Sequence, residues 1–157
     1  LEDFFTPNYL YDFFSELHSV EKSLSEKRKA ELFKKFGIDK FAEVKVGDLS
    51  TGMKQKVSLV ISIVHDPDFI ILDEPTNGLD VITAKTVTDF LVDLKNEGKT
   101  IIISTHIFSL VEKLCDRVGI IIDGKMAAEG DLKDITAEKD LETVFFGIYE
   151  KEGGENA

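Results

Sequence analysis

The chain has 157 residues, of which 43% are hydrophobic and 31% are charged, and its formal net charge is −11. These values describe an ordinary globular protein of one domain or two small ones, with enough apolar residues to build a core. The acidic excess disfavours broad electrostatic binding to nucleic acid, which needs a surplus of lysine and arginine, so we predict no nucleic-acid partner.

The single cysteine, Cys115, cannot form a disulfide within the chain, which favours a reducing compartment. No apolar run is long enough to span a bilayer, and no segment has the pattern of a signal peptide. The sequence therefore predicts a cytoplasmic chain that would reach a membrane only through a partner.

The first 37 residues predict two helices. Thr6-Pro7 is typical of a helix start, with the threonine as cap and the proline in the first turn. Apolar residues then recur at helical spacing, at Leu10, Phe13, Phe14 and Leu17. We expect this stripe to lie in the core; the alternative is that its aromatic residues bind a partner helix. Ser23 and Glu26 predict a capping box that opens a second helix, which ends near Gly37.

A third helix is predicted from about Thr51 to Val64, with Ser50 as its N-cap. The free N–H groups and positive dipole end of such a helix attract anions, and Gly52 lets a phosphate approach the backbone closely. A capped helix with only a structural role is the alternative.

The stretch Phe69-Ile70-Ile71-Leu72 predicts a strand that is covered on both faces, as in the centre of a parallel sheet. Asp73-Glu74-Pro75 follows directly, and proline cannot continue a central strand. Chemistry in open α/β sheets is located just beyond the carboxyl ends of the strands, where this acidic pair is expected. The alternative is an acidic cap on the next helix.

The rest of the chain alternates helices and strands. Val81 to Glu97 predicts a helix with Val87, Leu91 and Leu94 facing inward. Thr100 to Ser104 predicts a second buried strand, and it too ends in polar residues. Further along the chain we expect a short helix at 108–114, a hairpin at Asp123-Gly124 and a disordered tail at 151–157.

Four segments in this order resemble the motifs of the ATP-binding cassette (ABC) ATPases, the motor subunits of ABC transporters. Leu49-Ser50-Thr51-Gly52-Met53 resembles the signature Leu-Ser-Gly-Gly-Gln, and Phe69 to Glu74 resembles the Walker B motif. Asn77 to Asp80 is similar to the D-loop, and His106 to the switch histidine. The departures at Thr51 and Met53, with the following Lys54-Gln55-Lys56, look like the variant found in exporters of drugs, sodium or antibiotics.

The resemblance implies an α/β fold: a partial P-loop NTPase (RecA-like) core with a parallel sheet, preceded by an α-helical subdomain. The expected organisation is a helical subdomain with the signature motif at residues 1–65, the C-terminal part of the ATPase core at 66–150, and the tail at 151–157.

The resemblance also implies roles for site residues, with ATP and Mg²⁺ as cofactors. Asp73 would bind Mg²⁺ directly or through water, Glu74 would act as general base, and His106 would contact the γ-phosphate region. Asp80 would couple two sites. The signature residues would contact nucleotide held by a second ATPase subunit: Ser50, Thr51, Gly52 and Gln55. The other implied partner is a membrane-embedded permease, which would place the protein peripherally at the inner face of the cell membrane.

No Gly-x-x-x-x-Gly-Lys-Ser/Thr phosphate loop occurs in these 157 residues; the nearest match, Gly47 to Gly52, is followed by Met53. We therefore expect the C-terminal portion of a longer ATPase, lacking the Walker A motif, which by itself neither binds ATP tightly nor hydrolyses it. Two alternatives remain: a soluble ABC-type ATPase that acts on ribosomes or DNA, and a non-catalytic interaction module.

Overall fold

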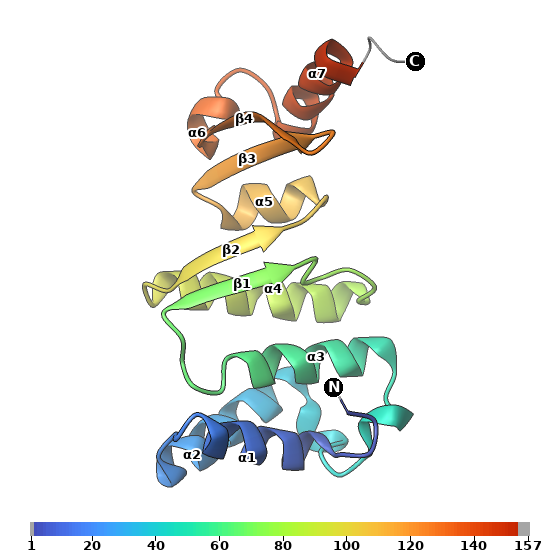
Figure 1. The fold of residues 1–157 in the computed structure, drawn as a ribbon, viewed down its shortest axis with the longest axis vertical. Coiled ribbons are helices and arrows are strands. Elements are labelled where there is room, and N and C mark those ends of the chain that lie inside the picture. The colour runs from blue at the N-terminus through green and yellow to red at the C-terminus, as the bar shows by residue number, and fades with distance from the viewer. Residues whose placement is uncertain (1, 154–157) are drawn as a thin grey trace. The chain divides into compact units, whose positions relative to one another are not determined.

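The structure is a computed structural model that describes residues 2–153 (Figure 1). Its chain forms two compact units, Leu1–Ser104 and Thr105–Ala157, which are described separately here. This division lies further along the chain than the boundary expected between residues 65 and 66, so the helical subdomain remains a prediction. Among the described helices, none is both long and apolar enough to cross a membrane.

The first unit begins with three helices, and short 3₁₀ turns precede the third. Their bounds are α1 Pro7–Leu17, α2 Lys22–Phe36, η1 Ile38–Lys40, η2 Val46–Asp48 and α3 Thr51–Ser62. Thr6 caps α1 as predicted, because its hydroxyl oxygen accepts the Tyr9 N–H at 3.2 Å. Gly37 ends α2 in the left-handed conformation with φ +67°, which also confirms the expectation.

The predicted capping box of α2 is wrong. Glu21, two residues earlier than the expected cap, accepts the backbone N–H groups of Ser23 and Leu24, each at 3.0 Å. Its carboxylate also accepts the Ser23 hydroxyl at 2.5 Å. Because the charged Glu21 side chain occupies the free N–H groups, Ser23 lies inside the helix and does not cap it.

Helix α1 buries a different set of residues from the predicted stripe. Leu10 is buried, but Phe13 is 47% and Leu17 is 63% exposed. The buried face instead includes Tyr11, whose ring meets that of Phe33 edge-on with centroids 5.6 Å apart. The face that packs on α2 is therefore rotated from the stripe toward Tyr11, which leaves Phe13 and Leu17 outside it.

Strands β1 (Phe69–Asp73) and β2 (Thr100–Ser104) form a parallel pair, joined by helix α4 (Val81–Asn96). Val87 and Leu91 of α4 are fully buried as predicted. Ile70 of β1 lines a cavity with Phe90 and Leu94 of α4, so α4 covers the face of the sheet that carries Ile70. The expectation that both faces are covered differs from the structure, because Ile71 on the opposite face is 71% exposed.

The second unit contains a β-hairpin and three helices. Its elements are α5 Phe108–Leu114, β3 Arg117–Ile122, β4 Lys125–Asp131, α6 Leu132–Ile135 and α7 Leu141–Gly153. The predicted hairpin is confirmed: Asp123 and Gly124 form its turn with φ +49° and +75°. Helix α7 includes residues 151–153, where the tail was expected to begin; the rest of that predicted tail, residues 154–157, lies outside the described residues.

A first prediction concerns Tyr11, whose buried hydroxyl has no hydrogen-bond partner among the described residues. Burial raises the pKa of this phenol to about 12, although the Arg28 charge opposes the shift. Because an unpaired buried hydroxyl is costly, Tyr11→Phe should raise the free energy of unfolding by about 1 kcal/mol. Urea denaturation measures this change.

The matched control is Tyr9→Phe, which removes a hydroxyl from a ring that is 49% exposed and should leave the unfolding free energy almost unchanged. A loss of stability in Tyr11→Phe would mean that the buried hydroxyl has a partner, such as a water molecule.

Candidate functional site

The acidic pair lies at the carboxyl end of β1, as predicted. Asp73 is the last residue of β1 and lies opposite Ser104, the last residue of β2. The Ser104 hydroxyl donates a hydrogen bond to Asp73 Oδ1, and the Glu74 backbone N–H donates to the Ser104 carbonyl at 2.9 Å. Ser104, at the end of β2, therefore holds both acidic residues at the end of β1.

A tight turn carries the chain from Glu74 to α4. Glu74 has φ +46°, a left-handed conformation that is uncommon for a residue with a side chain. Its carbonyl accepts the Asn77 N–H at 3.1 Å, and Thr76 within the turn is buried. Gly78, at φ +71°, occupies a second left-handed position, where glycine is least costly.

Asp80 ends this turn and caps α4. Its carboxylate accepts the N–H groups of Ile82 at 3.1 Å and Thr83 at 3.0 Å, together with the Thr83 hydroxyl at 2.6 Å. The hydrogen bond from the Thr83 hydroxyl, followed by those from the backbone, lowers the pKa of Asp80 below its ordinary value. The residue assigned by resemblance to the D-loop therefore also has a local structural role, which the sequence analysis missed. Asp followed three residues later by Thr, at the start of an apolar helix, is the signal that could have found it.

The signature-like segment forms the start of α3, as expected. Ser50 is the N-cap, and its hydroxyl oxygen accepts the Met53 N–H at 3.3 Å. Thr51 is exposed, while Gly52 and Gln55 are half-buried. A Cβ placed on Gly52 would lie 3.6 Å from a methyl group of Leu79. The beginning of α3 therefore lies beside the turn that follows Glu74.

The positive charge of Lys56 in α3 adds a smaller lowering of the pKa of Asp80, after the hydrogen bonds. The first unit thus brings together the acidic pair at the strand end, the turn that follows it, and the start of α3. His106 is exposed and belongs to the second unit, whereas the other predicted site residues belong to the first.

Asp73 has the chemistry that a magnesium ion requires. Its carboxylate is exposed and, with Oδ1 accepting one hydrogen bond, keeps further lone pairs for a cation. Among residues 2–153, no cluster of three or more acidic, histidine or cysteine side chains could hold a metal by itself. Mg²⁺ is commonly bound by one or two carboxylates together with substrate phosphates, so the residues fit a metal site that nucleotide completes.

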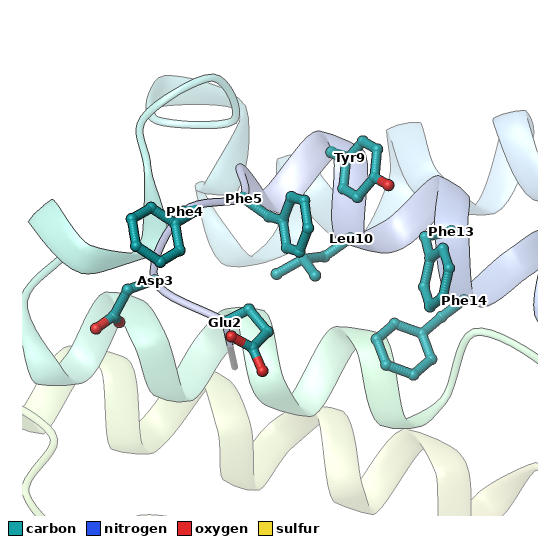
Figure 2. Close-up of a pocket in the computed structure, with 8 residues that line it drawn as sticks. All are labelled: Glu2, Asp3, Phe4, Phe5, Tyr9, Leu10, Phe13 and Phe14. Atoms are coloured by element: carbon teal, nitrogen blue, oxygen red, sulfur yellow. The ribbon is translucent and has the colours of Figure 1, made fainter.

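A separate apolar cavity of about 620 Å³ lies along α1 (Figure 2). Its lining consists of aromatic and aliphatic residues with two carboxylates: Glu2, Asp3, Phe4, Phe5, Tyr9, Leu10, Phe13 and Phe14. Three of the rings stack in succession, with centroid distances of 4.6 Å for Phe5–Tyr9 and 6.3 Å for Tyr9–Phe13. Phe5, just before α1, and Tyr9 and Phe13 within it therefore form a continuous aromatic surface. We call the cavity lined by these eight residues the aromatic groove.

Comparisons with known proteins identify the family of this chain. A family model described as "ABC transporter" matches residues 6–77. An ABC transporter ATP-binding protein of Methanocaldococcus jannaschii is 42% identical over 78% of this chain and 47% of that protein. The ABC transporter ATP-binding protein NatA of Bacillus subtilis is 35% identical over 92% of this chain and 60% of its own length.

One further relative and one solved structure point to the same family. The lantibiotic transport ATP-binding protein SrtF of Streptococcus pyogenes is 39% identical over 78% of this chain and 52% of that protein. A solved structure of the ATP-binding subunit of an ABC transporter has a TM-score of 0.87 and 26% identity, covering 94% of this chain and 64% of that one. The chain spans about half the length of the curated relatives that it matches. It belongs to the ABC transporter family, as part of an ATP-binding cassette domain.

Proposed function

We propose that this chain is part of the ATP-hydrolysing subunit of an ABC exporter, which couples ATP hydrolysis to transport through a membrane permease. The observation that carries the proposal is the acidic pair Asp73–Glu74, held at the carboxyl end of a parallel strand. Export is favoured by the names of relatives, which include a lantibiotic transport protein and a fluoroquinolone export protein of Mycobacterium tuberculosis. These names do not favour the alternative of an ATPase that acts on ribosomes or DNA.

Catalysis of phosphoryl transfer depends mainly on positioning the reacting groups and on stabilising the charge of the phosphates. In the proposed mechanism Asp73 holds Mg²⁺ directly or through water, and the ion, when bound, neutralises charge on the nucleotide phosphates. Glu74 accepts a proton from the attacking water as general base. The anchored backbone of Glu74 supports this role, because a base must be held within hydrogen-bonding distance of the water that it activates.

The remaining site residues require partners in this proposal. The start of α3, with Ser50, Thr51, Gly52 and Gln55, contacts nucleotide held by a second ATPase subunit. Free N–H groups in the first turn of α3 and the hydroxyl of Ser50 support anion binding there. His106 contacts the γ-phosphate region, and Asp80 couples the two nucleotide sites of the dimer.

The permease is the second proposed partner, and the aromatic groove is the surface that we assign to it. Cytoplasmic segments of membrane proteins carry an excess of lysine and arginine. Glu2 gives the groove a negative charge, which complements such a segment, while the rings accept its apolar side chains. The second carboxylate of the lining, Asp3, already pairs with Lys54 at 3.7 Å. The protein is then held at the inner face of the cell membrane through its permease.

The general-base role predicts the effect of Glu74→Gln in the complete ATP-binding protein that contains this chain. The amide cannot accept the proton, so kcat for ATP hydrolysis should fall by about 100-fold or more while ATP binding persists. Phosphate release and nucleotide binding are measured in parallel. Glu97→Gln, at an exposed glutamate just after α4, is the control and should hydrolyse ATP normally. Hydrolysis near the wild-type rate in Glu74→Gln would disprove the role.

The 157-residue chain by itself should bind MgATP only weakly, because its sequence contains no phosphate loop. In a titration followed by amide chemical shifts, we expect no saturable change below the millimolar range, and no hydrolysis. Tight saturable binding centred on Ser50, Asp73 and Glu74 would instead show a complete nucleotide site within these residues.

The aromatic groove predicts that Phe13→Asn weakens binding of the complete protein to its permease by about tenfold or more, as loss of an aromatic anchor commonly does. Affinity is measured with both proteins in detergent. Leu17→Asn is the matched control, since Leu17 is exposed on the same helix but does not line the groove. Equal weakening by both substitutions would contradict the assignment of the groove.

A further inference from the structure

Ser104 is the residue of β2 that contacts both members of the acidic pair. Its hydroxyl donates a hydrogen bond to Asp73 Oδ1, and its carbonyl accepts the Glu74 N–H at 2.9 Å. Asp73 and Ser104 are 31 residues apart in the chain, and the parallel register of β1 and β2 places them opposite each other. The sequence pattern alone marks Ser104 only as the polar end of a strand.

The hydroxyl contact restrains the direction of the Asp73 carboxylate. A carboxylate is planar, so a bond that holds Oδ1 also sets where its remaining lone pairs point. Partners that orient a ligating carboxylate are part of how proteins tune metal sites. Asp73 and Ser104 are both exposed, so this hydrogen bond is not required to satisfy a buried polar group.

The carbonyl contact restrains the backbone of Glu74. This residue has a left-handed φ of +46°, and the bond to Ser104 fixes its N–H at the point where the chain leaves the strand. A conformation of this kind persists when neighbouring structure holds it in place. One residue therefore acts on the side chain of Asp73 and on the main chain of Glu74.

We propose that Ser104 is a positioning residue of the ATPase site: its hydroxyl fixes the orientation of the Asp73 carboxylate, which would hold Mg²⁺, while its carbonyl anchors Glu74. The inference rests on the proposed function for the role of the metal, but the orientation of Asp73 is a property of this chain alone. Substitution of Ser104 separates the two contacts, because alanine removes the hydroxyl and keeps the backbone carbonyl.

The first experiment measures the Asp73 side-chain rotamer in the 157-residue chain, from NMR couplings that report the χ1 angle. Wild-type chain should show one dominant rotamer, and Ser104→Ala should show averaging among rotamers. Ser104→Thr keeps a hydroxyl and should restore the single rotamer. Thr100→Ala, which removes a hydroxyl at the other end of β2, is the matched control and should match wild type.

The second experiment uses the complete ATP-binding protein. Ser104→Ala should raise the Mg²⁺ concentration needed for half-maximal hydrolysis by about 10-fold or more, as loss of an orienting partner commonly does. Ser104→Thr and Thr100→Ala should show the wild-type Mg²⁺ dependence. A structural role alone would lower activity without changing the Mg²⁺ requirement.

The proposal is overturned if Asp73 keeps one rotamer in Ser104→Ala, or if the threonine variant is as impaired as the alanine variant. An unchanged Mg²⁺ requirement in Ser104→Ala would also overturn it. Failure of the proposed function is distinguishable, because it would appear as normal hydrolysis in Glu74→Gln, whereas the Asp73 rotamer does not depend on hydrolysis.

Discussion

The first unit of this protein depends on the parallel pairing of β1 with β2. Side chains alternate between the two faces of a strand, so a shift of one residue would move Ser104 to the opposite side from Asp73. Parallel neighbours also need a long connection, which α4 provides with 16 residues. Burial of Val87 and Leu91 on α4 stabilises this unit, and the register then decides which polar groups meet at the carboxyl end of the sheet.

The turn after β1 leads to α4, and it also packs beside the start of α3. Glu74 and Gly78 both have left-handed φ values, and Asp80 then starts α4 by accepting two of its free N–H groups. Leu79 lies close to Gly52, so the turn and the signature-like segment are neighbours. The proposed metal ligand, the proposed base and the proposed contact to a second subunit are thus built into one compact unit, whose capping bonds also support α3 and α4.

The two sides of helix α1 differ in burial: one packs into the unit and the other is partly exposed. Tyr11 is buried in the unit on one side, while Tyr9 and Phe13 on the other side remain about half exposed and line the aromatic groove. Exposed rings that stack on one another, beside acidic side chains, are better suited to contact with a partner than to a core. The proposed permease contact therefore lies on a surface distinct from the acidic pair within the same unit.

Features that depend on a few neighbouring residues were predictable from the sequence. Thr6 and Ser50 cap their helices, Gly37 ends one, and Asp123-Gly124 forms the hairpin turn, as expected. Each is set by hydrogen bonds and φ angles within about four residues, which local residue types largely determine. The Glu21 cap is the exception, since a competing acceptor two residues away displaced the predicted one.

The order of the motifs also allowed the family to be recognised and the acidic pair to be placed at a strand end. Tertiary structure alone decided which apolar residues are buried, because Phe13 and Ile71 have the same character as their buried neighbours and differ only in what packs against them. It also decided that Ser104 meets Asp73, 31 residues away. That contact follows from strand register, which arises from packing between distant segments and has no local signal in the chain.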